Sequence, residues 1–260
     1  MGPEPNRPTE NAGRTEAVVI IKASPQVGDR HGETVCCAGI DLYGRWLRLY
    51  PVSFRLLDRN KKFARWDRIS FSWRRPRDDP RPESRRVDQD SIAIQGILPK
   101  SERPGFLDKA IVTSLRRERE AGRSLALLRA EIVGFFVEKK TSSQMEDEAA
   151  RFERVRAQTD LFSKESVPHR VCPYKFKYTY RMDDGERTGT CQDWETEATF
   201  WNWSRMKGEA AALEEMQRIF GEEYPRKGML LAMGTHSLYP DTWLINGVVR
   251  MNSSGQATLF

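Results

Sequence analysis

The sequence of 260 residues has few histidines and cysteines, and it has no long apolar run. Its three histidines do not belong to an HExxH motif, and GxSxG, P-loop and GxGxxG motifs are absent as well. No apolar run approaches the roughly 20 residues of a membrane-spanning helix. Residues 1–16 also lack the apolar core of a signal peptide. We therefore expect a cytoplasmic protein with no membrane partner.

The four cysteines are Cys36, Cys37, Cys172 and Cys191. Their spacing fits neither a disulfide framework nor a zinc site built from two CxxC pairs. Adjacent strand residues point to opposite faces, so Cys36 and Cys37 do not easily share one metal ion. We expect reduced, buried cysteines, with no metal and no cofactor.

Charged residues are abundant and nearly balanced. The chain has 43 Lys and Arg against 37 Asp and Glu, a net charge of +6 with a pI near 9.2. Between residues 55 and 90, however, 12 basic residues stand against 7 acidic ones. This window either binds phosphate groups or is a solvated loop whose arginines are neutralised by Asp78, Asp79 and Glu83.

Residues 45–50 alternate between two chemically different faces. At the two-residue period of a strand, Trp46, Arg48 and Tyr50 point away from Leu47 and Leu49. Aromatic rings stack on bases and arginine binds phosphate, so this face fits DNA or RNA, although it also fits a packing surface. The predicted interface comprises Arg45, Trp46, Arg48, Tyr50, Lys61, Lys62, Arg65, Trp66, Arg74 and Arg75, backed by Arg77, Arg81, Arg85 and Arg86.

Two further segments alternate clearly. Residues 68–74 place Ile69, Phe71 and Trp73 on one face, which we expect to be buried, and leave Arg68 and Arg74 exposed. In residues 174–181, the four aromatic residues at 174, 176, 178 and 180 form a predicted core face. The opposite face would extend the basic surface through Lys175, Lys177 and Arg181.

Asp193, Trp194 and Glu195 allow two interpretations. Together with His236, the two carboxylates resemble the ligands of a metal-dependent nuclease, which would make Asp193, Glu195 and His236 catalytic. If a helix begins at Trp194, however, residues 193 and 195 point about 200° apart around its axis and cannot chelate one ion. Asp193 would then cap the helix, and asparagine would replace it at little cost.

The elements alternate without a βαβ rhythm, which predicts an α+β fold with antiparallel β-barrel-like lobes and helical insertions. Residues 1–16 have the composition of a disordered arm. We divide the rest into a β-barrel-like domain at 17–124 and an α+β domain at 125–260. Helices are expected near 54–63, 106–123, 146–158, 192–206 and 209–220.

Four stretches resemble a family of uncharacterised bacterial proteins: GETVCCAGIDLYGRWLRLYPVSF, CPYKFKYTYRMDDG, the DWE triplet and GTHSLYPDTWLINGV. The resemblance spans most of residues 18–250. It implies paired oligonucleotide-binding-type (OB-like) β-barrels and a setting near mobile-element or antiviral defence genes. The predicted barrel-like lobes are either OB-like or PUA-like. Related sequences have a Cys- and His-rich segment before the DWE triplet that suggests zinc, whereas residues 182–190 contain neither residue.

Three functions are compatible with these patterns. The first is nucleic-acid binding through the basic and aromatic surface. The second is metal-dependent processing of nucleic acid centred on the DWE triplet. The third is a protein-interaction adaptor in which Trp46, Trp66 and Tyr50 anchor a protein partner.

Overall fold

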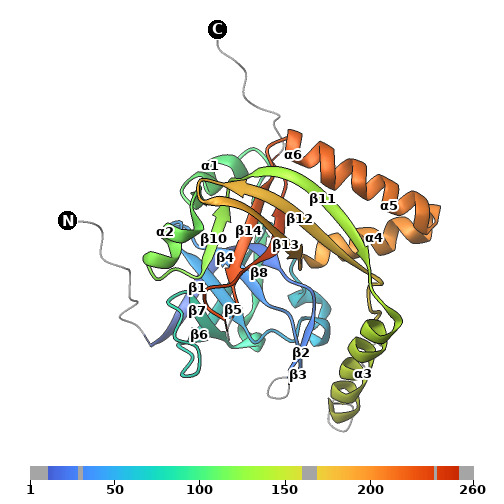
Figure 1. Cartoon of the computed structure of the whole chain (residues 1–260). Helices are drawn as coiled ribbons and strands as arrows, with labels where there is room; N and C mark the ends of the chain where they lie inside the picture. The colour runs from blue at the N-terminus through green and yellow to red at the C-terminus, as the bar shows by residue number, and fades with distance from the viewer. Residues whose placement is uncertain (1–10, 29–31, 160–168, 237–238, 252–260) are drawn as a thin grey trace. The chain divides into compact units, whose positions relative to one another are not determined.

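The computed structural model describes residues 11–28, 32–159, 169–236 and 239–251 (Figure 1). Their contacts divide into two compact units. The barrel unit contains residues up to 97 together with 138–175, and the sheet unit contains 98–137 together with the chain from 176 onward. Among the described helices, none is long and apolar enough to cross a membrane.

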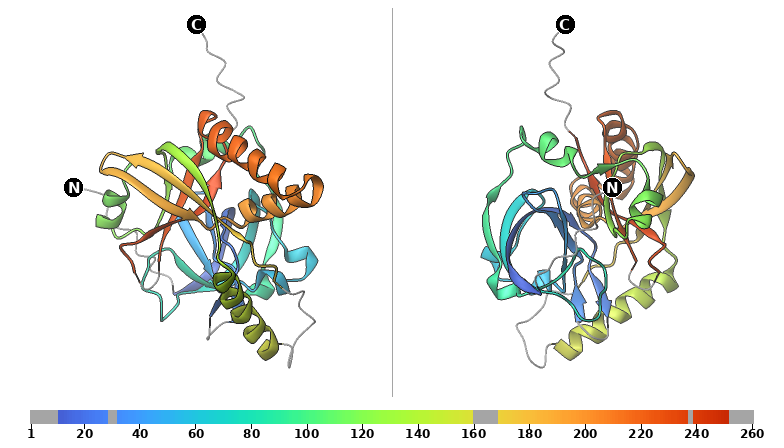
Figure 2. Two further views of the ribbon diagram at one scale, coloured as in Figure 1. Left: turned by 45° about the vertical axis from the view of Figure 1, so that its right-hand side comes forward. Right: turned by 90° about the vertical axis from the view of Figure 1, so that its left-hand side faces the viewer.

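Five strands of the barrel unit close into a β-barrel, seen as a ring in the right-hand view of Figure 2. Their order is β1-β4-β5-β7-β6, and β6 closes the ring by pairing with β1. All neighbours are antiparallel except β5 and β7. The strands are β1 (Ala12–Lys22), β4 (Cys37–Ile40), β5 (Trp46–Tyr50), β6 (Asp67–Arg74) and β7 (Ser84–Val87), with β8 (Ala93–Ile97) beside the first half of β6.

Shorter elements complete the barrel unit. The predicted helix near 54–63 is instead two 3₁₀ turns, whereas the predicted helix near 146–158 is confirmed as part of α3. The elements are β2 (Gln26–Gly28), β3 (Gly32–Thr34), η1 (Phe54–Leu56), η2 (Arg59–Lys61), η3 (Gln89–Ser91) and α3 (Ser142–Thr159).

Strand β1 is long enough to have a partner on each side. Its first part, Ala12–Val18, pairs with β6, and Val18–Lys22 pairs with β4. At the closest approach of β1 and β4, a Cβ on Gly39 would lie 2.6 Å from the Val18 carbonyl oxygen, so only glycine fits there. The prediction of a disordered arm is wrong for residues 12–16, because their pairing with β6 orders them. Residues 1–10 of that arm lie outside the described ranges.

The alternating pattern of β6 is confirmed. Ile69, Phe71 and Trp73 are buried, while Arg68 and Arg74 are exposed. Ser70 is the exception, because it is buried on the outer face, where its hydroxyl accepts hydrogen bonds from Arg14 at 3.1 Å and Gln95 at 2.8 Å.

The sheet unit contains a seven-stranded mixed sheet in the order β11-β12-β13-β15-β14-β10-β9. Two neighbouring pairs, β13 with β15 and β10 with β9, are parallel, so this second sheet is mixed where the sequence predicted antiparallel strands. The strands are β9 (Ile111–Val112), β10 (Leu125–Leu128), β11 (Glu131–Lys139), β12 (Tyr174–Met182), β13 (Gly185–Cys191), β14 (Leu230–Thr235) and β15 (Trp243–Val249). The mixed α+β class is confirmed.

The domain boundary predicted at 124/125 differs from the division of contacts. The segment from 98 to 137 belongs with the sheet unit because β9 pairs with β10, and 138–175 returns to the barrel unit. The predicted helix 106–123 is interrupted by β9, which leaves two short helices. The helices of this unit are α1 (Arg103–Asp108), α2 (Leu115–Glu120), α4 (Trp194–Lys207), α5 (Glu209–Arg218), the π-helical turn η4 (Ile219–Glu223) and α6 (Tyr224–Arg226).

The aromatic face of β12 is buried, as predicted. The Tyr178 ring lies 4.9 Å from that of Phe135, and its hydroxyl donates to the Phe220 carbonyl oxygen at 3.3 Å. That carbonyl lies in the π-helical turn η4, so Tyr178 satisfies a buried backbone acceptor there. Burial raises the pKa of Tyr178 well above its ordinary value.

Trp73 provides a test of the barrel core. Trp73→Ala should lower the free energy of unfolding by roughly 3–5 kcal/mol, because it empties a buried aromatic site. Denaturant titration measures the loss. The matched control is Arg68→Ala on the same strand, which should change stability by less than about 0.5 kcal/mol because its side chain is exposed. A loss below about 1 kcal/mol for Trp73→Ala would contradict the strand register.

Candidate nucleic-acid interface

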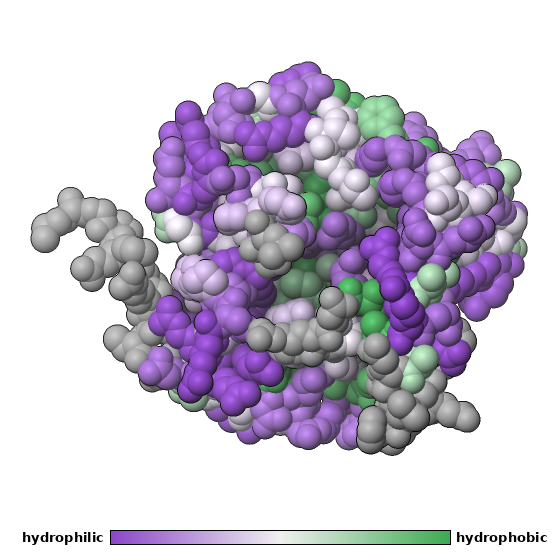
Figure 3. Space-filling model, turned by 60° about the horizontal axis from the view of Figure 1, so that its bottom comes forward, coloured by the Kyte–Doolittle hydropathy of each residue, from purple (hydrophilic) through white to green (hydrophobic). Residues whose placement is uncertain are grey.

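Hydrophilic residues cover most of the face drawn in Figure 3, in agreement with a composition that is 31% charged. The presence of lysine or arginine therefore does not mark a site on this protein. What distinguishes one basic side chain from another is its burial and whether a carboxylate neutralises it. The predicted interface residues differ in both properties.

The prediction that Arg48 lies on the surface is wrong. It is only 2% exposed, and its Nη1 lies 3.7 Å from the Cys36 Sγ. Arg48 is buried because the outer face of the neighbouring strand β4 is buried as well. Ala38, which is the cross-strand partner of Arg48, is a buried residue of that face. Trp46 on the same face is half-buried and Tyr50 is exposed. The face of β5 is therefore available only at its Tyr50 end.

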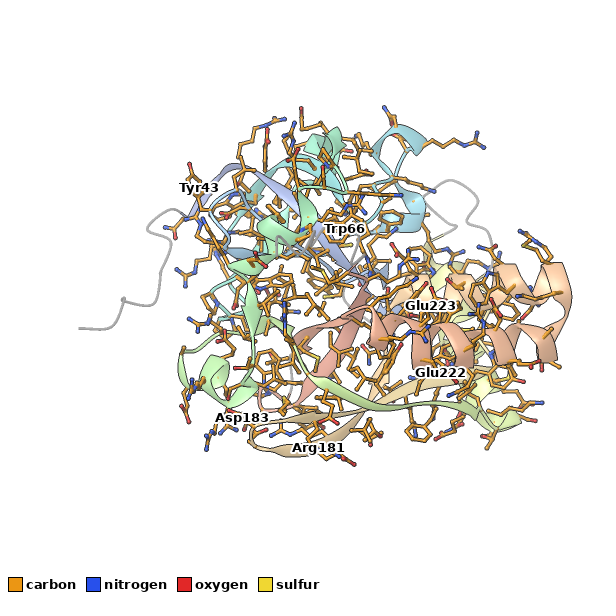
Figure 4. All side chains as sticks on the ribbon, turned by 90° about the horizontal axis from the view of Figure 1, so that it is seen from above. Tyr43, Trp66, Arg181, Asp183, Glu222 and Glu223 are labelled. Carbon is orange, nitrogen blue, oxygen red and sulfur yellow. The ribbon has the colours of Figure 1, made fainter. Side chains whose placement is uncertain are left out.

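Arg65 is also buried and is not a surface residue. Trp66 follows it with a φ of +76°, a left-handed conformation that is unusual for a bulky residue. Its N–H donates to the Val19 carbonyl oxygen at 2.8 Å, which fixes this turn against β1. The main chain at the half-buried Trp66, which is labelled in Figure 4, is thus held against the barrel.

Most other predicted basic residues have partners. Arg45 is paired with Asp41 at 2.7 Å, and Lys61 with Asp90 at 3.5 Å. Lys62 donates to the Arg55 carbonyl oxygen at 3.0 Å. These groups are at least partly neutralised or satisfied within the chain.

The basic residues of β12 are similarly engaged. Arg181, labelled in Figure 4, forms ion pairs with Glu131 and Glu186 at 3.0 Å each, and Lys175 lies 3.6 Å from Glu138. Lys177 is half-buried. The outer face of β12 is therefore a network of ion pairs and has little excess positive charge.

A different arrangement occurs where β5, β7 and β6 lie side by side. Arg74 of β6 is directly opposite Arg86 of β7, and Arg86 is the partner of Tyr50 in the parallel pair β5–β7. Partner residues share a face, and this face is the outer one because Leu49, next to Tyr50, is buried in the barrel. We call these three residues the Tyr50–Arg86–Arg74 row.

The two arginines of this row have no ion pair with any residue that the structure describes. Like charges directly opposite each other destabilise a sheet. The loop after β6 adds Arg75 and Arg77, both exposed and likewise without an ion pair among the described residues. The row and the start of the loop thus concentrate uncompensated positive charge beside an aromatic ring.

The predicted neutralisation of this loop is seen at its far end, at Asp79. Asp79 pairs with Arg81 at 2.7 Å and accepts a hydrogen bond from the Ser84 hydroxyl at 2.6 Å. Burial raises the pKa of Asp79, but these hydrogen bonds outweigh it and leave the pKa below its ordinary value. Asp79 is thus committed to Arg81 and does not neutralise the row.

Tyr43 is a candidate that the sequence reasoning missed. It lies in the turn between β4 and β5, is 80% exposed, and has the Arg45 guanidinium 5.1 Å from its ring centroid (Figure 4). Asp41 fixes the turn, because its Oδ1 accepts from the N–H groups of Tyr43 and Arg45 at 2.9 Å each. The strand directions place this turn at the same end of the barrel as the end of β6. The sequence does contain a signal for this turn: Asp41 stands three residues before Gly44, and Gly44 has a φ of +83°.

The DWE triplet begins helix α4, and the capping interpretation is confirmed. Asp193 is the N-cap residue, and its Oδ1 accepts from the Glu195 N–H at 3.1 Å. Its Oδ2 accepts from the Val248 N–H at 2.8 Å, a second bond that the sequence did not predict. Both carboxylate oxygens are therefore used to join the start of α4 to β15.

The three predicted catalytic residues are not brought together. The His236 N–H donates to the Thr242 carbonyl oxygen, six residues before the Val248 that Asp193 contacts. At the rise of a strand this separates His236 from Asp193 by roughly 15–20 Å. Within the described ranges, no group of three His, Cys, Asp or Glu side chains could hold a metal ion.

The other histidines differ in their placement. His31 lies outside the described residues. His169 stacks on Phe152 with ring centroids 3.9 Å apart. Burial, helped by the positive charges of Arg55 and Lys140 and opposed by Glu148, lowers the pKa of His169 to about 4.

His169 should therefore remain neutral through the physiological range. Because the folded pKa of about 4 lies below the ordinary 6.5, protonation favours the unfolded chain, and stability present above pH 6.5 is lost as the pH falls toward 4. NMR titration of the His169 ring measures this pKa. Phe152→Ala should move it back toward 6.5, and a wild-type value near 6.5 would contradict the packing.

Asp193 provides a test of the cap. Asp193→Asn should lower the free energy of unfolding by about 1–3 kcal/mol, because an amide replaces one accepting oxygen with a donor that faces a buried N–H group. This corrects the expectation from capping alone that asparagine costs little. Denaturant titration measures the loss, and Glu214→Gln on an exposed part of α5 controls for the change in charge. An Asp193→Asn protein as stable as wild type would contradict the second hydrogen bond.

Two family models match the chain. Domain of unknown function (DUF8758) matches residues 13–109, which include the barrel except Ala12 at the start of β1, and Domain of unknown function (DUF8757) matches residues 109–260. No curated protein matches the chain significantly. Because the second match covers more than half of the 260 residues, the chain belongs to the family of the domain of unknown function DUF8757.

Proposed function

We propose that this protein binds nucleic acid through the Tyr50–Arg86–Arg74 row. The observation that carries the proposal is the pair of arginines opposite each other on β6 and β7 without a carboxylate partner in the described chain. Such a pair costs stability in the free protein, and a bound phosphate would remove that cost. Tyr50 beside the pair offers a ring on which a base can stack.

The barrel supports this proposal by its topology. A closed five-stranded barrel is the architecture of OB-type modules, which bind oligonucleotides on the second and third strands and the adjoining loops. Here the second strand is β4, whose outer face is buried, so the proposed ligand path is displaced. It runs from the exposed end of β5 across β7 and β6. Tyr43 is an exposed ring in the turn before β5, at the end of the barrel where β6 finishes, whereas Tyr50 lies at the other end of β5.

The test is the salt dependence of binding, measured by fluorescence anisotropy with single-stranded DNA and RNA. Each phosphate contact on a single strand contributes about −0.7 to the slope of log K against log salt. Arg74→Ala with Arg86→Ala should therefore reduce the slope by about 1.4 and weaken binding. The double variant should fold normally, because it relieves a repulsion.

Two further variants complete the test. Tyr50→Ala should weaken binding by about 1–3 kcal/mol through lost stacking, whereas Tyr50→Phe should retain it. Arg116→Ala, on an exposed position of α2, is the matched control for lost charge and should leave the slope unchanged. Arg48 is unsuitable for charge reversal, because Arg48→Glu would bury a carboxylate. Absence of binding at low salt would end the proposal and favour a protein partner at Leu42 and Tyr43, which are both highly exposed.

A further inference from the structure

Arg85 lies on the other side of β7 from the row, at the mouth of the barrel. Its cross-strand partner on β5 is Leu49, a core residue, and its guanidinium lies 4.4 Å over the ring of Trp73. Although arginine is usually exposed, Arg85 is only 8% exposed. Its Nη1 donates to the carbonyl oxygens of Pro82 and Ser84 at 2.9 Å each. These contacts fix the position of the guanidinium.

The remaining donors of Arg85 are not used. Its Nε is buried without an acceptor, and its Nη2 has no acceptor among the described residues but, unlike Nε, is not fully buried. The Nη2 group therefore keeps both of its protons for a ligand. Among the described residues no carboxylate forms an ion pair with Arg85, and a buried cation in that position is stabilised by a bound anion.

Other arginines gather around Arg85. The ladder that pairs Arg74 with Arg86 places Arg75 beside Arg85, on the face opposite to the row. Burial lowers the pKa of Arg85, and the positive charges of Arg45 and Arg75 lower it further. Two carboxylates, Glu83 and Asp41, oppose this effect, but Asp41 is bonded to Arg45 and to its own turn. The mouth thus has three guanidinium groups.

We propose that the mouth of the barrel binds a phosphate dianion between Arg85 and Arg75, with Arg45 at its side. Planar guanidinium groups bind phosphate in a bidentate manner, and a phosphomonoester has a charge of about −1.5 to −2 at pH 7. It therefore suits this cluster better than a backbone phosphodiester, which has a single charge. The chemical class is a terminal phosphate, and its source is the end of a nucleic-acid strand or free phosphate.

The inference that the mouth binds phosphate does not depend on the proposed function. The inference that this phosphate belongs to the end of a nucleic-acid strand rests on it. The mouth and the row use different arginines on opposite faces of β7. Variants at Arg75 and Arg85 therefore test the mouth without removing Arg74 or Arg86.

The first experiment titrates the full chain with inorganic phosphate by calorimetry at constant ionic strength. We expect saturable binding, weakened about tenfold or more by Arg75→Ala and by Arg85→Lys, which keeps the charge but loses the fork. Arg75 is exposed, so its variant should fold even if Arg85→Lys does not. Arg116→Ala should bind phosphate within about twofold of wild type. Binding that does not saturate, or that Arg75→Ala leaves unchanged, would overturn the proposal.

The second experiment identifies the source of the phosphate. Anisotropy compares internally labelled oligonucleotides with a 5′-phosphate, a 3′-phosphate or only hydroxyl ends. Tighter binding of a phosphorylated end, lost in Arg75→Ala, would show that the ligand is the end of a strand. Equal affinities together with saturable phosphate binding would show that the ligand is free phosphate. Oligonucleotide binding without phosphate binding would overturn this inference and leave the proposed function intact.

Discussion

The barrel depends on the double pairing of β1. Because Ala12–Val18 pairs with β6 while Val18–Lys22 pairs with β4, one strand both begins the sheet and closes it. Closure leaves neither β1 nor β6 with a free edge along this ladder. It also holds the end of β6 beside β7, which is what places Arg74 opposite Arg86 and Arg85 over Trp73. Both proposed sites therefore follow from this pairing.

Local alternation in the sequence predicted the interior of the barrel well. Ile69, Phe71 and Trp73 are buried as expected, because a period of two specifies which side chains share a face. The same rule grouped Trp46, Arg48 and Tyr50 correctly, but it could not say whether their face meets water. Arg48 is buried because the outer side of β4 is buried as well, and that depends on residues distant in the sequence.

Contacts between distant residues also explain the other differences. Asp193 was predicted as a cap from its position before Trp194, but its bond to Val248 spans 55 residues and leaves no local pattern. Likewise, the arginines of residues 55–90 look equivalent in the sequence. The structure separates Arg81, which Asp79 neutralises, from Arg74 and Arg86, which face each other. The sequence therefore reveals the basic window at residues 55–90. It does not reveal which of its arginines lack a carboxylate partner among the described residues.

The turn fixed by Asp41 has a consequence for affinity. An exposed tyrosine on a flexible loop loses conformational freedom when a ligand orders it, and this loss is subtracted from the stacking energy. Here Asp41 accepts two backbone N–H groups and the Arg45 Nε, so the backbone beneath Tyr43 is already ordered in the free protein. Only the side-chain rotation of Tyr43 remains to be restricted. The turn therefore presents its ring as a rigid, preorganised contact, and one buried carboxylate determines how much binding energy that contact can contribute.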